Sequence, residues 1–454
     1  MRFIFAGLLL ILSTGIGAAQ AVQQQVLNNG LKVIVKEDHR SPVVVSMIWY
    51  KVGSADEPAG ITGVSHVLEH MLFKGTKRYK IGEFARIIAE NGGKQNAFTS
   101  TDYTAYFEQL EKSRLPISFE LEADRMRGAL MDKKEFAKEI KVVIDERLYR
   151  TDNSASGKLS EKFMATAYRK HYYKNPIIGW MPDLKSMKAS DARAWYRRWY
   201  TPRNATLVVV GDVKAGEVFA LAQKYFGNID SPKVNGTSIP VEPRQTKERR
   251  SRIKFPANVP SFILGYHVPT AGHGKQAWEP YALSVLSGIL DGGLSARLET
   301  QLIRKQRVAS SIGTSYHMYH EWPTMFMFYG SPAKGRKIEE VEQALLQQIR
   351  RVQYGKITRA EIRRVKAQTI ASQVFGRDSL FNQARLIGMM ETTGRSWREV
   401  DQYVQRIKAV TPEQVQQVAR KYLVARNRTV TILDPIPIKN KKGLRRPAGG
   451  RHGR

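Results

Sequence analysis

Two histidines and a glutamate lie within one short stretch, residues 60–74, with the sequence GITGVSHVLEHMLFK. If this stretch is helical, His66, Glu69 and His70 share one face, and most of the apolar residues lie on the opposite face. Histidines at positions i and i+4 lie on adjacent turns, where both imidazoles can bind one metal ion. A carboxylate beside them can act as a general base. The pattern also arises by chance, so a metal site requires a third ligand from elsewhere in the chain.

A predicted helix over residues 133–150 offers that third ligand. Glu139 and Glu146 are separated by two helical turns, and Val142 and Val143 lie between them on the same face. A carboxylate in an apolar stripe needs a cation or a proton, because burying it unpaired is costly. Glutamates on helices usually face solvent, so position alone leaves their role open. Because the two histidines still lack a third ligand, a functional role for these two glutamates is favoured.

Length and composition set the broad class. The chain has 454 residues, of which 42% are hydrophobic and 25% charged, which indicates a globular protein of two or three domains. It contains no cysteine, which excludes disulfides and thiolate metal ligands. Any metal site must therefore use histidine and carboxylate ligands.

Both ends of the chain differ from its body. Residues 1–21 combine Arg2, an apolar run and small residues ending in Ala-Gln-Ala, which is typical of a cleaved secretory signal and predicts a periplasmic protein. A membrane anchor is the alternative, although the apolar run is short for a span. Residues 439–454 are basic and rich in Gly and Pro, and predict a disordered tail. The net charge of +32 suggests electrostatic contact with anionic surfaces, whereas the secreted location and the lack of an aromatic and basic motif argue against nucleic acid.

The order of elements predicts an α+β fold with two homologous domains, each an antiparallel-rich sheet packed with helices. Strands are expected at 94–99 and 104–110, soon after the histidine helix, and an apolar strand at 205–211. A pattern that begins at Met187-Lys-Ala and leads into this strand recurs from Ile407-Lys-Ala into a second apolar strand. The predicted boundaries are 22–240 for a metal-binding domain, 241–254 for a linker and 255–438 for a second domain without the metal motif.

Taken together, these motifs resemble the pitrilysin or insulinase family of zinc peptidases, which includes the mitochondrial processing peptidase. The resemblance covers the chain from about Val26 to Pro435. The order His66-x-x-Glu69-His70 is that of the inverted zincins, and Glu146 in VVIDER, with Glu139 before it, matches the spacing of the family's ligand and additional acidic residue. The resemblance implies Zn²⁺ bound by His66, His70 and Glu146, with one ion per chain.

The resemblance also assigns roles to other residues. It implies that Glu69 is the general base and that Glu139 orients a ligand. It further implies that peptide substrates bind as an added strand along Asn96, Ala97, Phe98 and Thr99. Without the resemblance, Asn96 would be taken as a turn residue after Gly92-Gly93.

One part of the family pattern is incomplete. Active members hold the substrate carbonyl with an Arg and a following Tyr from a second pair of domains. Arg304 stands at a fitting place, but no Tyr occurs until Tyr316, which is the alternative candidate. The sequence therefore predicts a zinc endopeptidase that hydrolyses unfolded peptides and needs a homologous partner chain, in a heterodimer or a homodimer, to supply the Arg and Tyr. The alternative from another class is a non-catalytic scaffold subunit, which has no need of an intact base and ligand set.

Overall fold

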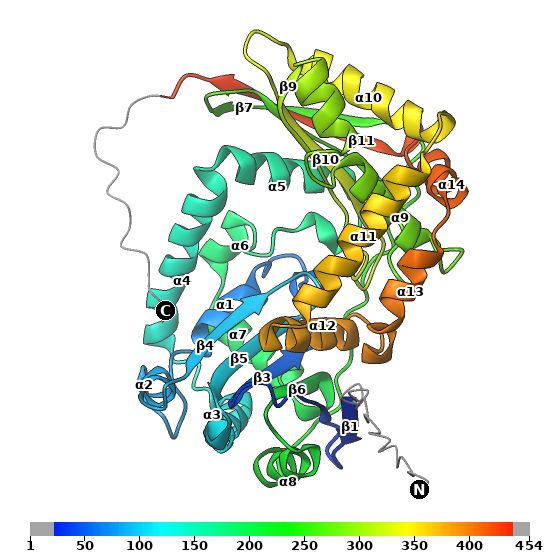
Figure 1. Ribbon diagram of the computed structural model, residues 1–454. Coiled ribbons are helices and arrows are strands. Elements are labelled where there is room, and N and C mark those ends of the chain that lie inside the picture. Colours follow the sequence, from blue (N-terminus) through cyan, green and yellow to red (C-terminus); the bar gives the residue numbers. More distant parts are fainter. Residues whose placement is uncertain (1–21, 439–454) are drawn as a thin grey trace, which may run out of the picture.

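Two mixed sheets organise the chain in the computed structural model, which describes residues 22–438 (Figure 1). The first sheet has the order β1-β2-β6-β3-β5-β4, with strands β1 Val22–Val26, β2 Lys32–Glu37, β3 Val43–Tyr50, β4 Lys94–Thr99, β5 Thr104–Glu111 and β6 Ala205–Gly211. The second has the order β7-β11-β8-β10-β9, with strands β7 Arg249–Pro256, β8 Ser261–Val268, β9 Ala309–Ser315, β10 Thr324–Pro332 and β11 Arg428–Ile436. Neighbours are antiparallel except the pairs β2–β6 and β7–β11.

Helices pack on both sheets. In the first half they are α1 Val64–Met71, α2 Glu83–Glu90, α3 Leu115–Gly128, α4 Lys133–Arg147, α5 Ala155–Ala167, α6 Met181–Ser186, α7 Ala189–Trp199 and α8 Ala215–Phe226. In the second half they are α9 Glu279–Leu290, α10 Ile338–Tyr354, α11 Arg359–Gly376, α12 Leu380–Thr392, α13 Gln402–Ala409 and α14 Pro412–Tyr422. The predicted fold class, α+β with two domains, is confirmed.

The central strands of the first sheet are buried on both faces. All of β6 and all but the first residue of β3 are buried, as their continuous β-branched and apolar runs require. Helices cover one face, where α1 and α3 join the main core, and α12 covers the other. The predicted strands at 94–99 and 205–211 have these same bounds in the structure.

The internal repeat is visible at atomic detail. In each half a helix leads through a short 3₁₀ turn into a central strand: α7 into β6, and α14 into β11. At the matching positions, the Asn204 side chain donates to the Trp199 carbonyl and the Asn427 side chain donates to the Tyr422 carbonyl, at 3.0 Å in both cases. Each asparagine satisfies a carbonyl at the end of its helix. By strand order, the edge strand β9 of the second sheet corresponds to β4 of the first.

One helix of each domain packs against the sheet of the other domain. Helix α5 of the first half packs against β7 and β11, and α12 of the second half packs against β3 and β6 (Figure 1). A Cβ at Gly388 in α12 would overlap the indole of Trp49, so the close approach of this helix to the sheet requires glycine. The boundary between the domains is therefore an extensive shared interface.

Two predictions about chain organisation were wrong in detail. Residues 249–254 were assigned to the linker because their side chains are polar and basic, but they form most of β7. Pairing with β11 satisfies the hydrogen-bonding groups of their backbone. A single helix is also predicted over residues 183–200, but the structure has two helices there, α6 and α7, separated at Met187–Lys188. The predicted signal segment 1–21 and tail 439–454 lie outside the described residues. Among residues 22–438, none of the helices is long and apolar enough to span a bilayer.

Candidate metal centre

The start of α1 is fixed by a buried carboxylate. Glu57, which is fully buried, accepts hydrogen bonds from the backbone N–H of Gly63 at 2.6 Å and of Ser65 at 2.8 Å. These N–H groups have no partner within the helix, and a carboxylate is favourable at this end of the helix. Gly63 has a φ of 88°, and a Cβ there would lie 2.6 Å from the Ile178 carbonyl. Contacts outside the metal cluster therefore fix the start of α1 and, with it, the helix that carries both histidines.

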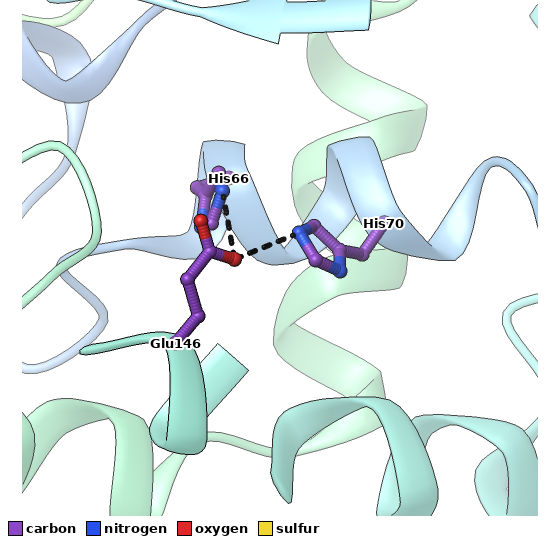
Figure 2. Close-up of side chains that lie close together, drawn as sticks. All are labelled: His66, His70 and Glu146. Atoms are coloured by element: carbon purple, nitrogen blue, oxygen red, sulfur yellow. Dashed lines mark ion pairs between the residues drawn. The ribbon is translucent and has the colours of Figure 1, made fainter. Parts of the chain in front are cut away.

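The two histidines and Glu146 meet at one point between α1 and α4. Figure 2 shows the Glu146 carboxylate between the rings, with Oε2 at 3.8 Å from His66 Nε2 and 3.5 Å from His70 Nε2. One ligand atom from each residue lies within 4.8 Å of the other two. It is the one group of three or more potential ligands found among residues 22–438. The structure thus brings together the three predicted ligands.

Glu139 is not one of the three clustered ligands, but it contacts one of them, His70. Its Oε1 lies 2.8 Å from His70 Nδ1 and its Oε2 lies 2.6 Å from Lys74 Nζ. A carboxylate at Nδ1 places a proton on that nitrogen, so Nε2, on the side of Glu146, is the atom that His70 would offer to a metal ion. The assigned orienting role therefore has a geometric basis. Val142, predicted on the same buried face, is 44% exposed, because the helix turns that side to solvent, whereas Val143 is buried.

Burial and neighbouring charges shift the pKa of each of the three predicted ligands. Burial and the neighbouring His70 lower the pKa of His66 to about 4, so this ring is neutral, as a ligand must be. Burial lowers the pKa of His70, but its hydrogen bonds to Glu139 and Glu146 outweigh burial and raise its pKa to about 9. Burial raises the pKa of Glu146, but the two histidines and Arg150 outweigh burial and lower this pKa to about 2. Two imidazoles and one carboxylate in a site with no cysteine form the donor set of a zinc centre with an open position.

Glu69 lies beside the ligands without belonging to the cluster. Its carboxylate accepts a hydrogen bond from the Thr99 hydroxyl at the end of β4. Burial raises the pKa of Glu69, and the Thr99 hydroxyl partly opposes that shift. A partly buried carboxylate with a raised pKa holds a proton more readily than a free one, which suits a group that must accept and return a proton. Thr99, assigned to substrate binding, therefore positions the predicted base.

The other residues of the predicted substrate strand differ in their surroundings. The Asn96 side chain accepts the Ala97 N–H at 2.8 Å. Phe98 packs its ring on Trp49, with 5.3 Å between the centroids, so this side chain belongs to the sheet and not to a substrate surface. Phe98 was predicted to bind substrate through its main chain as part of an added strand, so the packing of its side chain does not bear on that prediction.

Arg304 and Tyr316, the two candidates for holding the substrate carbonyl, each bond within the second domain. Arg304 lies in the short π-helix Glu299–Lys305, where its guanidinium donates to Glu299 at 3.0 Å. The Tyr316 hydroxyl donates to the Pro269 carbonyl at 2.7 Å, and its ring stacks on Phe326. Tyr316 is therefore committed to its own domain, which weakens the alternative that it replaces the missing tyrosine.

Comparisons with known proteins agree with this geometry. The family model described as Insulinase (Peptidase family M16) matches residues 32–180, and the model described as Peptidase M16 inactive domain matches residues 186–369. The zinc protease PqqE of Helicobacter pylori is 34% identical over 391 residues, which are 84% of this chain and 87% of that protein. The chain belongs to the M16 family. A protein of Mycobacterium bovis named as an uncharacterized zinc protease is 28% identical over 92% of this M16 chain and 94% of its own length.

Solved structures extend the agreement to the fold. A protease from Helicobacter pylori superposes with a TM-score of 0.86 at 31% identity, covering 92% of this M16 chain and 100% of that chain. The periplasmic protease PqqL from Escherichia coli gives a TM-score of 0.75 at 20% identity, covering 91% of this chain but 47% of that chain. The M16 fold thus accounts for both halves of the chain, and the predicted family is confirmed.

Sequence reasoning missed several residues that hold the M16 site in place. Glu57 caps α1, Lys74 binds Glu139, and Arg150 lies 2.8 Å from Glu146 Oε1. No spacing rule points to Glu57 or Thr99, because each reaches its partner only through the fold. Lys74 and Arg150 are each one helical turn from a predicted site residue, so helix periodicity gave a signal for them.

Replacing Glu139 with Gln will weaken zinc binding by about 10- to 100-fold, because His70 loses its charged partner while its ligand geometry remains. The affinity is measured by competition with a chromogenic chelator. Glu135→Gln, on the same helix but paired with Lys138 at the surface, is the matched control. Equal zinc affinity of the Glu139 variant and the unchanged protein would contradict the orienting role.

Proposed function

We propose that this M16 chain is a zinc-dependent endopeptidase that hydrolyses unfolded peptides or protein segments in the periplasm. The observation that carries the proposal is the convergence of His66, His70 and Glu146 beside Glu69, with Glu69 tied to the end of the edge strand β4. A scaffold needs neither a ligand set nor a base placed next to it. The name "inactive domain" concerns residues 186–369, which lie outside the metal cluster.

Strand β4 has a free edge at which a peptide can add. It pairs with β5 alone and lies next to α1. The Ser100 N–H donates to the Tyr103 carbonyl, and hydrogen-bonded pairs alternate along an antiparallel ladder. The backbone groups of Ala97 and Thr99 therefore point away from β5 to the free edge, where the Asn96 side chain accepts the Ala97 N–H and a bound peptide would take its place. Pairing through these groups requires an extended peptide and asks little of its sequence, which favours unfolded substrates.

The chain's own residues define the chemistry. Bound at the cluster, Zn²⁺ would supply a Lewis acid that polarises the scissile carbonyl and acidifies a water molecule. Glu69 takes the proton from the attacking water and delivers it to the leaving amine nitrogen. Thr99 holds the carboxylate of Glu69, and Glu139 holds the ring of His70. The peptide backbone, paired along Ala97 and Thr99, presents its scissile bond next to α1.

Replacing Ala97 with Pro will raise KM for an unfolded peptide by about tenfold, which corresponds to about 1.4 kcal/mol of lost binding. Proline removes the N–H that points to the free edge and leaves the pairing with β5 intact, which edge strands tolerate. The measurement is steady-state cleavage of a fluorogenic peptide by the zinc-loaded protein, in the presence of any partner needed for activity. Ala97→Val, which keeps the N–H, is the matched control. A proline variant with unchanged KM and unchanged melting temperature would refute strand addition at this edge.

The proposal includes a partner chain. Tyr316, the first Tyr after Arg304 in the sequence, donates its hydroxyl to the Pro269 carbonyl of its own domain. This chain covers 47% of PqqL of Escherichia coli, so that polypeptide is long enough to contain a second half of this size. A homologous chain, in a heterodimer or a homodimer, would bring the missing Arg and Tyr. Affinity capture of the tagged protein from periplasm, followed by a cleavage assay of the protein alone and with each captured homologue, tests this. Full activity of the chain alone at concentrations where it is monomeric would remove the need for a partner.

A further inference from the structure

One side of the turn that follows β4 is hydrogen-bonded to the first domain. It comprises Ser100 to Tyr103 and joins β4 to β5. The backbone N–H of Ser54 donates to the Ser100 carbonyl at 3.1 Å, and that of Ala55 donates to the Thr101 carbonyl at 2.8 Å. A Cβ at Gly53 would lie 2.5 Å from both carbonyls, so the approach of these two segments requires glycine. The turn is therefore well defined on this side.

On its other side the turn binds the second domain through Asp102. This carboxylate is 2% exposed and accepts four hydrogen bonds, one of them from the adjacent Thr101 hydroxyl at 3.3 Å. Tyr173 of the first domain donates its hydroxyl at 2.5 Å, His320 donates from Nδ1 at 2.9 Å, and the Glu321 N–H donates at 3.3 Å. His320 and Glu321 belong to the connection between β9 and β10. Asp102 is thus shared between the two domains.

Neighbouring contacts reinforce the same junction. The Trp322 N–H donates to the Tyr173 hydroxyl at 3.2 Å, so the tyrosine links Asp102 to the β9–β10 connection a second time. Lys51, just after β3, lies 3.3 Å from Glu321. A buried carboxylate deprived of a donor loses a charge-assisted hydrogen bond, which is stronger than one between neutral groups. The β9–β10 connection and the β4–β5 turn should therefore move as one body.

The same turn starts directly after Thr99, whose hydroxyl holds Glu69, and ends the strand whose edge groups would pair with a peptide. We propose that Asp102 and His320 form an interdomain latch through which the second domain positions the substrate strand and the base. Asp102 and His320 are positioning residues, since neither is a ligand of the metal cluster nor a partner of Glu69. The proposal rests on the proposed peptidase function for its effect on turnover, but not for its effect on the turn itself.

A matched interdomain carboxylate lies at the far side of the same sheet. Asp38, just after β2, is buried, accepts the Gln383 side chain of α12 at 3.1 Å, and pairs with Arg40. Strand β2 is separated from β4 by β6, β3 and β5. Asp38→Asn therefore weakens an interdomain contact without touching the β4–β5 turn.

The test compares His320→Ala, His320→Asn and Asp38→Asn in the full-length, zinc-loaded protein. Hydrogen–deuterium exchange of peptides spanning residues 96–106 is measured together with zinc content, KM and kcat for an unfolded peptide. We expect His320→Ala to speed exchange in this segment and to raise KM about three- to tenfold, or about 0.7–1.4 kcal/mol, with zinc content unchanged. His320→Asn places an amide N–H near the position of Nδ1 and should restore most of both effects. Asp38→Asn should leave both readouts unchanged.

Two outcomes overturn the latch: unchanged exchange and KM in His320→Ala, or equal effects in Asp38→Asn, which would indicate general loosening of the interface. If the unchanged protein hydrolyses no peptide under any condition, the proposed function fails. The exchange comparison still decides whether the second domain holds the β4–β5 turn, so the two failures are distinguishable.

Discussion

Replacing Glu69 with Gln will abolish peptide hydrolysis, with a loss of about 10²- to 10⁴-fold in kcat, and will leave the zinc content unchanged. The amide is nearly isosteric, and its oxygen can still accept the Thr99 hydroxyl, so the local structure is preserved. It cannot take a proton from water. Because the metal cluster comprises His66, His70 and Glu146, the substitution removes no ligand.

The measurement pairs steady-state cleavage of a fluorogenic peptide with metal analysis of the same preparation. Glu90→Gln is the control, since Glu90 lies on α2 at the surface, where it pairs with Arg86. Hydrolysis by the Glu69 variant at more than about a tenth of the unchanged rate would rule out Glu69 as the base, because the smallest effect expected of such a group is larger.

Replacing Glu146 with Ala will remove both bound zinc and activity. Two histidines on one helix cannot close a zinc site, and a third protein ligand is required for stable binding in catalytic centres. The loss also leaves Arg150 without its carboxylate partner, which further disfavours a cation at the cluster. The expected result is substoichiometric zinc after dialysis, against about one ion per chain in the unchanged protein.

Glu135→Ala, in the first turn of the same helix, controls for effects on α4. Melting temperature in the presence of excess chelator separates metal loss from misfolding, because the two proteins should then be similar. Stoichiometric zinc in the Glu146 variant would mean that another group closes the site, and the assignment of the third ligand would be wrong.

The two predictions depend on different parts of the site, so they fail independently. Loss of activity with retained zinc in Glu69→Gln, together with loss of zinc in Glu146→Ala, would distinguish a peptidase from a scaffold that kept only its metal. A scaffold would lose zinc in the second variant but would show no activity to lose in the first.

Local pattern alone determined the elements that carry the chemistry. The apolar, β-branched runs fixed the strands that became β3 and β6, because such runs can only be buried. Helical periodicity placed His66, Glu69 and His70 on one face of α1, and Glu139 and Glu146 on one side of α4. Composition excluded thiolate ligands. The repeat of a helix, a turn and a strand gave the two-domain plan, which depends on local order along the chain and not on distant contacts.

Periodicity was less reliable where burial depends on a neighbour. Val142 and Val143 were expected on one buried face, yet only Val143 is covered. Residues 249–254 have the composition of a linker, and they are a strand only because β11, far along the chain, pairs with them. In both cases the deciding contact lies outside the local window.

Local patterns were enough to identify the kind of site, which has two imidazoles, a carboxylate as third ligand and an adjacent base, each on a predictable element. The tertiary structure decided which groups control them, since Glu57 caps α1, Thr99 holds Glu69, Glu139 holds His70 and Asp102 binds His320 only where the folded chain brings them together. Hydrogen bonds between segments distant in sequence leave no periodic signal. Residue type and spacing therefore named the chemistry, and the packing of elements from both domains set its geometry.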